Sequence, residues 1–397
     1  MAIESVPRAF GAHNVSSRAA GAAGPIARML DRLDSHSGEH GSFLGGERTN
    51  GDATAAQWTH PPSGVRAVKP VQFGFTHDAP EFGSQQPEHW IEGESLAMGE
   101  RVALPAPFVA FAAHKRSGSQ NTRQQPADNA VNRLRAGFLE LIRNDAALIA
   151  WHGGLALTEV HVHTVKGAYA TTCLHWLRQQ GGSVRMFLAP AVGNFPVIIA
   201  VYESSTGAMA VGVGCEFDQY AAASEALGAL TANVTAISDE PAGYQHTEPE
   251  SSKISSEKAA GDEQLAVHLA VHSGPMARAH YGAWLDQAHP TLCRFSDIYS
   301  PIELGSDHSS STLQRSKNDV RIIVDRLAAE GFEALTVQQD GSYSALVPGL
   351  LPLELGWPDP HALHMSRLEQ AARMNGADGK FTPLYVPHPF IYQSEAA

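Results

Sequence analysis

The stretch NRLRAGFLELIRNDAALIAWH, residues 132–152, has the pattern of a helix. Its apolar residues recur at intervals of three and four, as they do on one face of an amphipathic helix. The spacing predicts a long core-facing helix over 130–152. Glu140 and Asp145 lie within it, with Arg143 and Asn144 between them. These four residues raise the question whether the helix carries catalytic acids or is a core helix with a charged rim.

Outward from this helix, candidate strands and helices alternate, and two neighbouring strands are joined by a short turn that predicts a β-hairpin. We therefore expect an α/β fold, more exactly a mixed α+β fold with flanking helices, in a single domain over 1–397. Asp218 is the expected N-cap of one of the helices. The predicted strands are 158–165, 183–191, 195–205, 207–217 and 343–356, and the predicted helices are 168–182 and 218–237, with a helix, a glycine turn and a strand over 318–339.

Three polar segments interrupt this alternation. Residues 34–65 are rich in Gly, Ser, His and Thr and lack periodic apolar residues, and residues 238–264 and 305–319 are polar runs of the same character. Such composition is typical of loops, so we expect flexible segments there within the single domain.

Composition excludes several classes of protein. The chain has 397 residues, 43% of them hydrophobic, and a formal net charge of −13, which argues against nucleic-acid binding. It has no apolar run long enough to span a membrane and no signal-peptide pattern at its start. The three cysteines, Cys173, Cys215 and Cys293, are far apart, which fits a reducing cytoplasm and gives no Cys-based zinc site.

Several motifs in order resemble the YcaO family, in particular its azoline-forming branch. They run from about residue 89 to 390 and cover HWIEGESLAMGERVALPAPFVAF, RAGFLELIRNDAALIAW, FPVIIAVYESSTGAMAVGVGCEFDQYAAASEAL, ALVPGLLPLELG and PLYVPHPF. Each match alone is weak, but together they are specific. The resemblance implies a YcaO fold and a place in the biosynthesis of thiazole/oxazole-modified ribosomal peptides.

The resemblance also implies a reaction. In the family, a Cys, Ser or Thr side chain of a precursor peptide attacks the preceding amide, ATP phosphorylates the amide oxygen, and elimination leaves an azoline. Acidic side chains hold the Mg²⁺ ions that in turn hold the triphosphate. The implied partners are the precursor peptide and an intact YcaO-like, E1-like or leader-binding protein, in a homo- or heterodimer. No leader-binding segment is expected before residue 89.

The middle acidic motif of the family falls on the opening helix. Glu140 and Asp145 are kept, but Arg143 stands where the resemblance implies Glu, and Asn144 stands where it implies Arg. A cation at 143 would repel Mg²⁺. Without the resemblance, Glu140 and Asp145 read as solvated acids on a helix surface.

The other two motifs are depleted as well. In GPIARMLDR, residues 24–32, Asp31 is the one acid kept. In SEALGALTANV, residues 224–234, Gly228, Ala229 and Ala232 stand where the resemblance implies Glu and Gln, and Glu225 comes one turn early. Glu140, Asp145 and Asp31 thus remain as candidates for a degenerate ATP and Mg²⁺ site. The expected cofactors are ATP and Mg²⁺ if the chain is active, and none if it is not.

Other constellations have simpler interpretations. His161 and His163 are two apart on a predicted strand, a spacing that zinc sites use, but a half-exposed strand face explains them equally. His268 and His272 have helical spacing without an acidic partner. Cys215 is expected to be a small core residue rather than a nucleophile. We predict no metal centre from these residues.

The proline-rich end provides the catalytic candidates. By resemblance, Pro387, His388 and Pro389 belong to the segment that lies at the active site of azoline-forming relatives, although seven residues continue past Phe390. The alternative is an ordinary solvated tail.

Two functional hypotheses follow. The depleted acids predict a cyclodehydratase-like, non-catalytic or partner-dependent subunit. The kept C-terminal motif favours the alternative, an active ATP-dependent cyclodehydratase that forms azolines from Cys, Ser or Thr.

Overall fold

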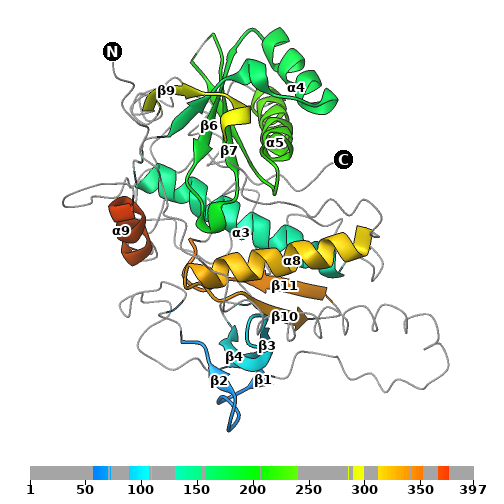
Figure 1. The fold of residues 1–397 in the computed structure, drawn as a ribbon, viewed down its shortest axis with the longest axis vertical. Helices are drawn as coiled ribbons and strands as arrows, with labels where there is room; N and C mark the ends of the chain where they lie inside the picture. Colours follow the sequence, from blue (N-terminus) through cyan, green and yellow to red (C-terminus); the bar gives the residue numbers. More distant parts are fainter. Residues whose placement is uncertain are drawn as a thin grey trace, which may run out of the picture.

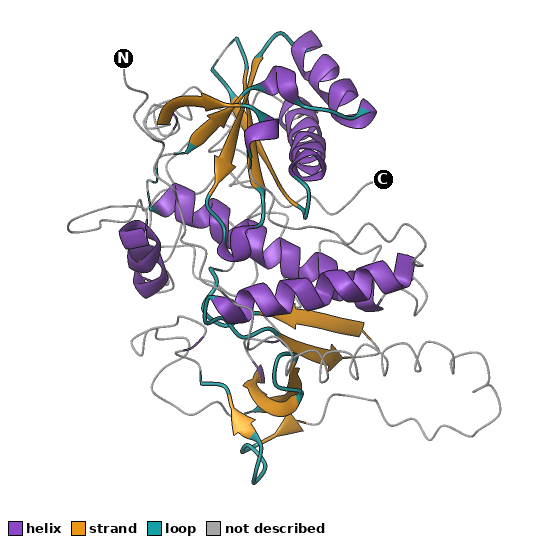
Figure 2. Cartoon of the chain, in the orientation of Figure 1, coloured by secondary structure: helices purple, strands orange, loops and turns teal. Residues whose placement is uncertain are grey.

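The computed structural model confirms a mixed α+β architecture with two sheets and the long helix between them (Figure 1; Figure 2). It describes residues 57–69, 72, 89–106, 109, 130–153, 155, 157–205, 207–239, 285, 289–298, 312–339, 342–351 and 365–374. Within these ranges, no helix is both long and apolar enough to cross a membrane.

The first sheet has the order β11-β10-β3-β4-β2, and β1 pairs with β3 beside this path. All of its pairs are antiparallel except β2 with β4. The hairpin of β3 and β4 was not among the sequence-based expectations. The strands are β1 Gln57–Trp58, β2 Arg66–Ala67, β3 Trp90–Ser95, β4 Glu100–Pro105, β10 Leu335–Gln339 and β11 Ser342–Leu346.

The second sheet has the order β8-β7-β6-β5-β9. Here β5 pairs with β9 in parallel and the other pairs are antiparallel, so the predicted hairpin of β7 and β8 is confirmed. The strands are β5 Thr158–Val160, β6 Ser183–Ala189, β7 Val197–Glu203, β8 Met209–Cys215 and β9 His289–Cys293.

The described helices cover these sheets. Figure 1 shows α3 crossing the middle of the molecule between the sheets, with α8 beside it, while α4 and α5 lie on one side of the second sheet. The helices are α3 Ala130–His152, α4 Ala168–Gln179, α5 Gln219–Asp239, α8 Thr312–Ala329 and α9 Met365–Met374, with short 3₁₀ turns η6 Val162–Thr164, η7 Val192–Asn194 and η8 Phe295–Asp297.

Helix α3 is the centre of the hydrophobic core. Its apolar side chains pack in one cluster with β7 and β8 of the second sheet and with β11 of the first. Phe138 and Trp151 are fully buried, as the 3.6-residue period predicts for the core face. The predicted helix over 130–152 is therefore confirmed, and side chains on several of its faces meet other parts of the protein.

Helix α5 packs very closely along the edge strand β8. A Cβ atom at Gly212 would lie 2.2 Å from the carbonyl oxygen of Ala226, and one at Gly214 would lie 2.1 Å from that of Ala222. Glycine at both positions is what allows the close approach. Asp218 caps α5 as predicted, because its Oδ1 accepts the backbone N–H groups of Tyr220 and Ala221.

Three sequence-based expectations are wrong in part. The strand predicted over 343–356 ends at Leu346 as β11, and a turn follows at Pro348 and Gly349. The strand predicted over 158–165 ends at Val160, and a 3₁₀ turn follows over Val162–Thr164. The polar loop predicted over 305–319 is helical from Thr312, where α8 begins. Of the polar segments predicted over 34–65 and 238–264, most residues lie outside the described ranges, and Gln57–Trp58 form β1.

Candidate functional site

The junction of α3, β8 and α5 holds an ion pair between the two helices. Arg143 Nη1 of α3 lies 2.8 Å from Glu225 Oε1 of α5. The other oxygen, Glu225 Oε2, accepts the backbone N–H of Cys215 at 2.8 Å. The Arg143 side chain is 20% exposed and that of Glu225 is 38% exposed, so solvent reaches the acid while the guanidinium is largely enclosed.

The electrostatics of this pair follow from partial burial. Burial raises the pKa of the Glu225 carboxyl, and the charge of Arg143 offsets this only in part. Burial lowers the pKa of Arg143, but the carboxylates of Glu225 and Glu140 more than compensate, so its pKa is raised. Arg143 is therefore a permanent cation that interacts with both acids.

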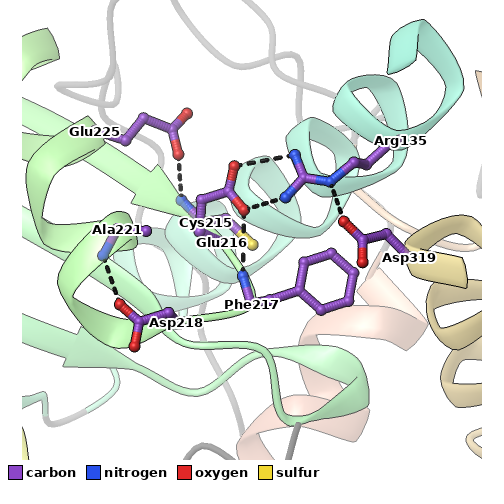
Figure 3. A network of polar contacts seen from close by, with 8 residues as sticks. All are labelled: Arg135, Cys215, Glu216, Phe217, Asp218, Ala221, Glu225 and Asp319. Carbon is purple, nitrogen blue, oxygen red and sulfur yellow. Dashed lines mark hydrogen bonds and ion pairs between the residues drawn. The ribbon is translucent and has the colours of Figure 1, made fainter. Parts of the chain in front are cut away.

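A second guanidinium of α3 joins three elements (Figure 3). Arg135 donates from both terminal nitrogens to the carboxylate of Glu216, just after β8, and its Nε lies 2.7 Å from Asp319 Oδ2 of α8. The guanidinium also stacks 5.2 Å from the ring centroid of Phe217, whose backbone N–H donates to Glu216. This network fixes α3 against the β8–α5 connection and α8.

Asp145 of α3 is fully buried, with 0% of its surface exposed. Its carboxylate accepts Arg367 Nε at 3.2 Å, Arg367 Nη2 at 2.6 Å and the backbone N–H of Leu351 at 3.0 Å. Asp145 therefore ties α9 and the segment after β11 to α3. Its interpretation as a solvated surface acid is wrong.

The remaining candidates fall into three groups. Glu140 is half-buried on α3 and interacts with Arg143 through its charge. Gly228 lies on α5, where a Cβ atom would be 2.7 Å from the hydroxyl of Tyr169. The other candidates lie outside the described residues, and these are Asp31, His268, His272, Pro387, His388 and Pro389.

The histidine and cysteine candidates have ordinary surroundings. His161 and His163 belong to the turn after β5 rather than to one strand face, and Glu159 is ion-paired with Arg185 at 2.6 Å. Cys215 is buried, and burial together with Glu225 holds the pKa of its thiol well above the usual value. A neutral buried thiol is a poor nucleophile, which agrees with its interpretation as a core residue.

Sequence reasoning missed four charged residues of this region: Arg135, Glu216, Asp319 and Arg367. Their partners lie far away in the chain, so no local spacing reveals them. A usable signal is present at Glu216, an acid between Cys215 and Phe217 at the end of an otherwise apolar strand. Such an acid must find a partner when the strand end is buried.

The described acids do not fit a site that would hold Mg²⁺ and a triphosphate. No group of three or more His, Cys, Asp or Glu side chains is arranged to hold a metal ion in the described ranges. Glu225 is paired with Arg143, Glu216 with Arg135 and Asp145 with Arg367. Mg²⁺ in triphosphate sites is held by free carboxylates and phosphate oxygens.

Comparison with known proteins identifies the family. The family model described as YcaO cyclodehydratase, ATP- and Mg²⁺-binding, matches residues 33–351. A search of curated proteins found no match.

Solved structures share the fold at low identity. A heterocyclase in complex with substrate and cofactor has a TM-score of 0.54 and 15% identity, with 84% of this chain and 45% of that chain covered. The heterocyclase TruD has a TM-score of 0.51 and 13% identity, with 82% and 45% covered. YcaO from Methanopyrus kandleri, bound with AMPPCP and Mg²⁺, has a TM-score of 0.47 and 17% identity, with 74% and 70% covered.

The chain thus spans 45% of the length of the two heterocyclases, and at these identities the likeness concerns the fold. The family model matches well over half of the chain, in the region that contains α3, β8 and α5. The chain belongs to the YcaO cyclodehydratase family.

Proposed function

We propose that this chain is a non-catalytic or partner-dependent subunit in the biosynthesis of thiazole/oxazole-modified ribosomal peptides. The observation that carries the proposal is the ion pair of Arg143 with Glu225. By the family resemblance, position 143 belongs to a helix whose acids hold Mg²⁺. In this chain the position supplies a positive charge instead.

The magnitude of the repulsion supports this reading. Two unit charges 4 Å apart interact with about 4 kcal/mol at the effective dielectric of a protein surface, and a divalent ion doubles that figure to about 8 kcal/mol. Glu140 and Glu225 with Arg143 sum to a single negative charge. One net charge is too little to attract Mg²⁺ against a guanidinium and to hold a triphosphate as well.

The role left to such a subunit is to hold the precursor peptide or to complete a partner. A solved heterocyclase of similar fold is bound to substrate and cofactor, which supports substrate binding as a role for this subunit. An intact YcaO-like or E1-like protein would then supply the ATP-dependent chemistry.

The second candidate is an active ATP-dependent cyclodehydratase. The sequence Pro387-His388-Pro389 favours it, because it resembles the proline-rich end of azoline-forming members. In that case the missing acids would come from a partner or from parts of the chain outside the described residues.

Calorimetry distinguishes the two candidates. The isolated chain is titrated with a non-hydrolysable ATP analogue and Mg²⁺, and the titration is repeated after adding a candidate partner protein. We expect no binding by the isolated chain, with its folded state verified by circular dichroism. Tight Mg²⁺-dependent binding by the chain alone, together with azoline formation on a precursor peptide, would establish the second candidate instead.

A further inference from the structure

The carboxylate of Glu225 is held in place by the main chain of β8. Its Oε2 accepts the N–H of Cys215 at the last position of the strand. Gly214 makes room for it, since a Cβ atom there would lie 2.9 Å from Glu225 Cβ. The strand and α5 thus hold the Glu225 carboxylate in its position independently of the cation that pairs with it.

The partly buried carboxylate of Glu225 requires a positive partner, and ions from solvent can reach it. Removing a carboxylate from water favours its neutral form unless a cation compensates. The Glu225 side chain is 38% exposed, so an ion from solvent can reach it. In the structure the compensating charge is the guanidinium of Arg143, which comes from α3.

Helix α3 uses the same arrangement a second time. Positions 135 and 143 are separated by about 12 Å along a helix at 1.5 Å per residue. Arg135 is ion-paired with Glu216, the residue next to Cys215, and with Asp319. Two guanidinium groups of one helix therefore face the two acids that flank the end of β8 and the start of α5.

We propose that Arg143 is a built-in cation: its guanidinium permanently occupies the cation position beside Glu225 and joins α3 to β8 and α5 without an added metal ion. This inference deepens the proposed function and rests on it, because it names what fills the cation position of the same site. Vacating the position should make it available to a small cation from solvent.

The test is rescue of folding stability by external cations. Arg143→Ala removes the guanidinium and leaves Glu225 in place, so its unfolding midpoint should fall by several degrees. Millimolar guanidinium or Mn²⁺, compared with sodium chloride of equal ionic strength, should then raise the midpoint of Arg143→Ala at least twice as much as that of the wild type. Arg143→Lys, which keeps a charge, should need no rescue.

Two controls isolate the charge of Glu225. In the double variant Arg143→Ala/Glu225→Gln, the rescue should disappear because the carboxylate that binds the cation is gone. Arg178→Ala, which removes an exposed arginine of α4, should respond to the cations as the wild type does.

Several results would overturn the inference. These are equal shifts in wild type and Arg143→Ala, the lack of rescue by either cation, or rescue that persists without the Glu225 carboxylate. If Arg143→Ala does not fold, Arg143→Met/Glu225→Gln decides the matter. Folding of this neutral pair supports a role as cation, and its failure to fold shows that Arg143 acts through packing.

These outcomes are separate from those of the nucleotide titration. The rescue is read as an unfolding temperature of variants without nucleotide, whereas the proposed function is tested by nucleotide binding to the wild type. Nucleotide binding with intact cation rescue would defeat the proposed function alone.

Discussion

Arg143 Nη1 lies 2.8 Å from Glu225 Oε1, and this contact joins two helices whose residues are 82 positions apart in the chain. By the family resemblance this helix should present acids to a metal, and at position 143 it presents a guanidinium to Glu225 instead. Together with the ion pairs of Arg135 and Asp145, the contact shows that charged residues of α3 connect the helix to its neighbours rather than form a solvated rim.

Asp145 should be a structural residue of large effect. Asp145→Ala leaves the guanidinium of Arg367, whose side chain is 6% exposed, without its buried counter-charge. Loss of one partner of a buried pair costs about 3–5 kcal/mol. Chemical denaturation should show this loss in the free energy of unfolding. A loss below about 1 kcal/mol would contradict the role assigned to Asp145, and Asp145→Ala/Arg367→Met should be less destabilised than the single variant.

The close packing of α5 on β8 predicts opposite outcomes for two glycines. In Gly212→Ala the new methyl would lie 2.2 Å from the backbone oxygen of Ala226, which cannot move without displacing the helix. We expect a loss of about 1–3 kcal/mol, as for other overpacked cores.

Gly228→Ala is the matched control. Its Cβ would meet the hydroxyl and the adjoining ring edge of Tyr169, the far end of a residue that is 61% exposed. Since alanine favours a helix over glycine by up to about 1 kcal/mol, this variant should be neutral or more stable in thermal unfolding. Equal destabilisation of both variants would show that the two contacts do not differ as described.

Stability should depend on Glu330 in mildly acidic solution. Burial raises the pKa of this carboxyl, although the backbone N–H of Gly193 and nearby arginines oppose the shift. The folded chain therefore binds a proton at a higher pH than the unfolded chain. The contribution of Glu330 to the free energy of unfolding is full at low pH and decreases as the pH rises from the ordinary glutamate value to the raised one.

Glu330→Gln should flatten the pH dependence in that window, because glutamine does not titrate and still accepts the N–H of Gly193 through its amide oxygen. Urea denaturation over a pH series measures this. The control is Glu369→Gln on α9, a glutamate whose side chain is 49% exposed. An unchanged profile in Glu330→Gln would rule out the assigned role.

Restoring the acid implied at position 143 should not restore nucleotide binding. Arg143→Glu places a third carboxylate beside Glu140 and Glu225, and like charges in partial burial repel one another. We expect the free energy of unfolding to fall by about 2–3 kcal/mol, between the values for losing an exposed and a buried ion pair. We also expect no binding of Mg²⁺ with a nucleotide. Recovery of binding in isothermal titration would mean that a single substitution had disabled the site.

Local pattern was sufficient for much of the fold. The period of 130–152 predicts α3, and the β-branched runs around the short turn after Glu203 predict the hairpin of β7 and β8. The prediction failed after Val160, where Thr164 Oγ1 donates to the carbonyl of His161 at 2.7 Å. A local side-chain hydrogen bond of this kind favours a turn over continuation of the strand.

The candidate site was predictable only in part. The charge reversal at Arg143 is readable from the family resemblance, and it led to the expectation of a degenerate site. The partners of Arg143 and Asp145 were not readable, because Asp145 and Arg367 are 222 positions apart and meet only through the tertiary fold. A residue's type indicates that it needs a partner, whereas the packing decides which one.

Whether the described acids can hold a metal–nucleotide complex is tested by titrating the wild-type chain with Mn²⁺ and a non-hydrolysable ATP analogue and recording the electron paramagnetic resonance signal of free Mn²⁺. We expect the same signal with the chain present as with the nucleotide alone, because Glu216 and Glu225 are already paired with guanidinium groups. A stoichiometric loss of signal that disappears in Glu225→Gln would contradict this expectation.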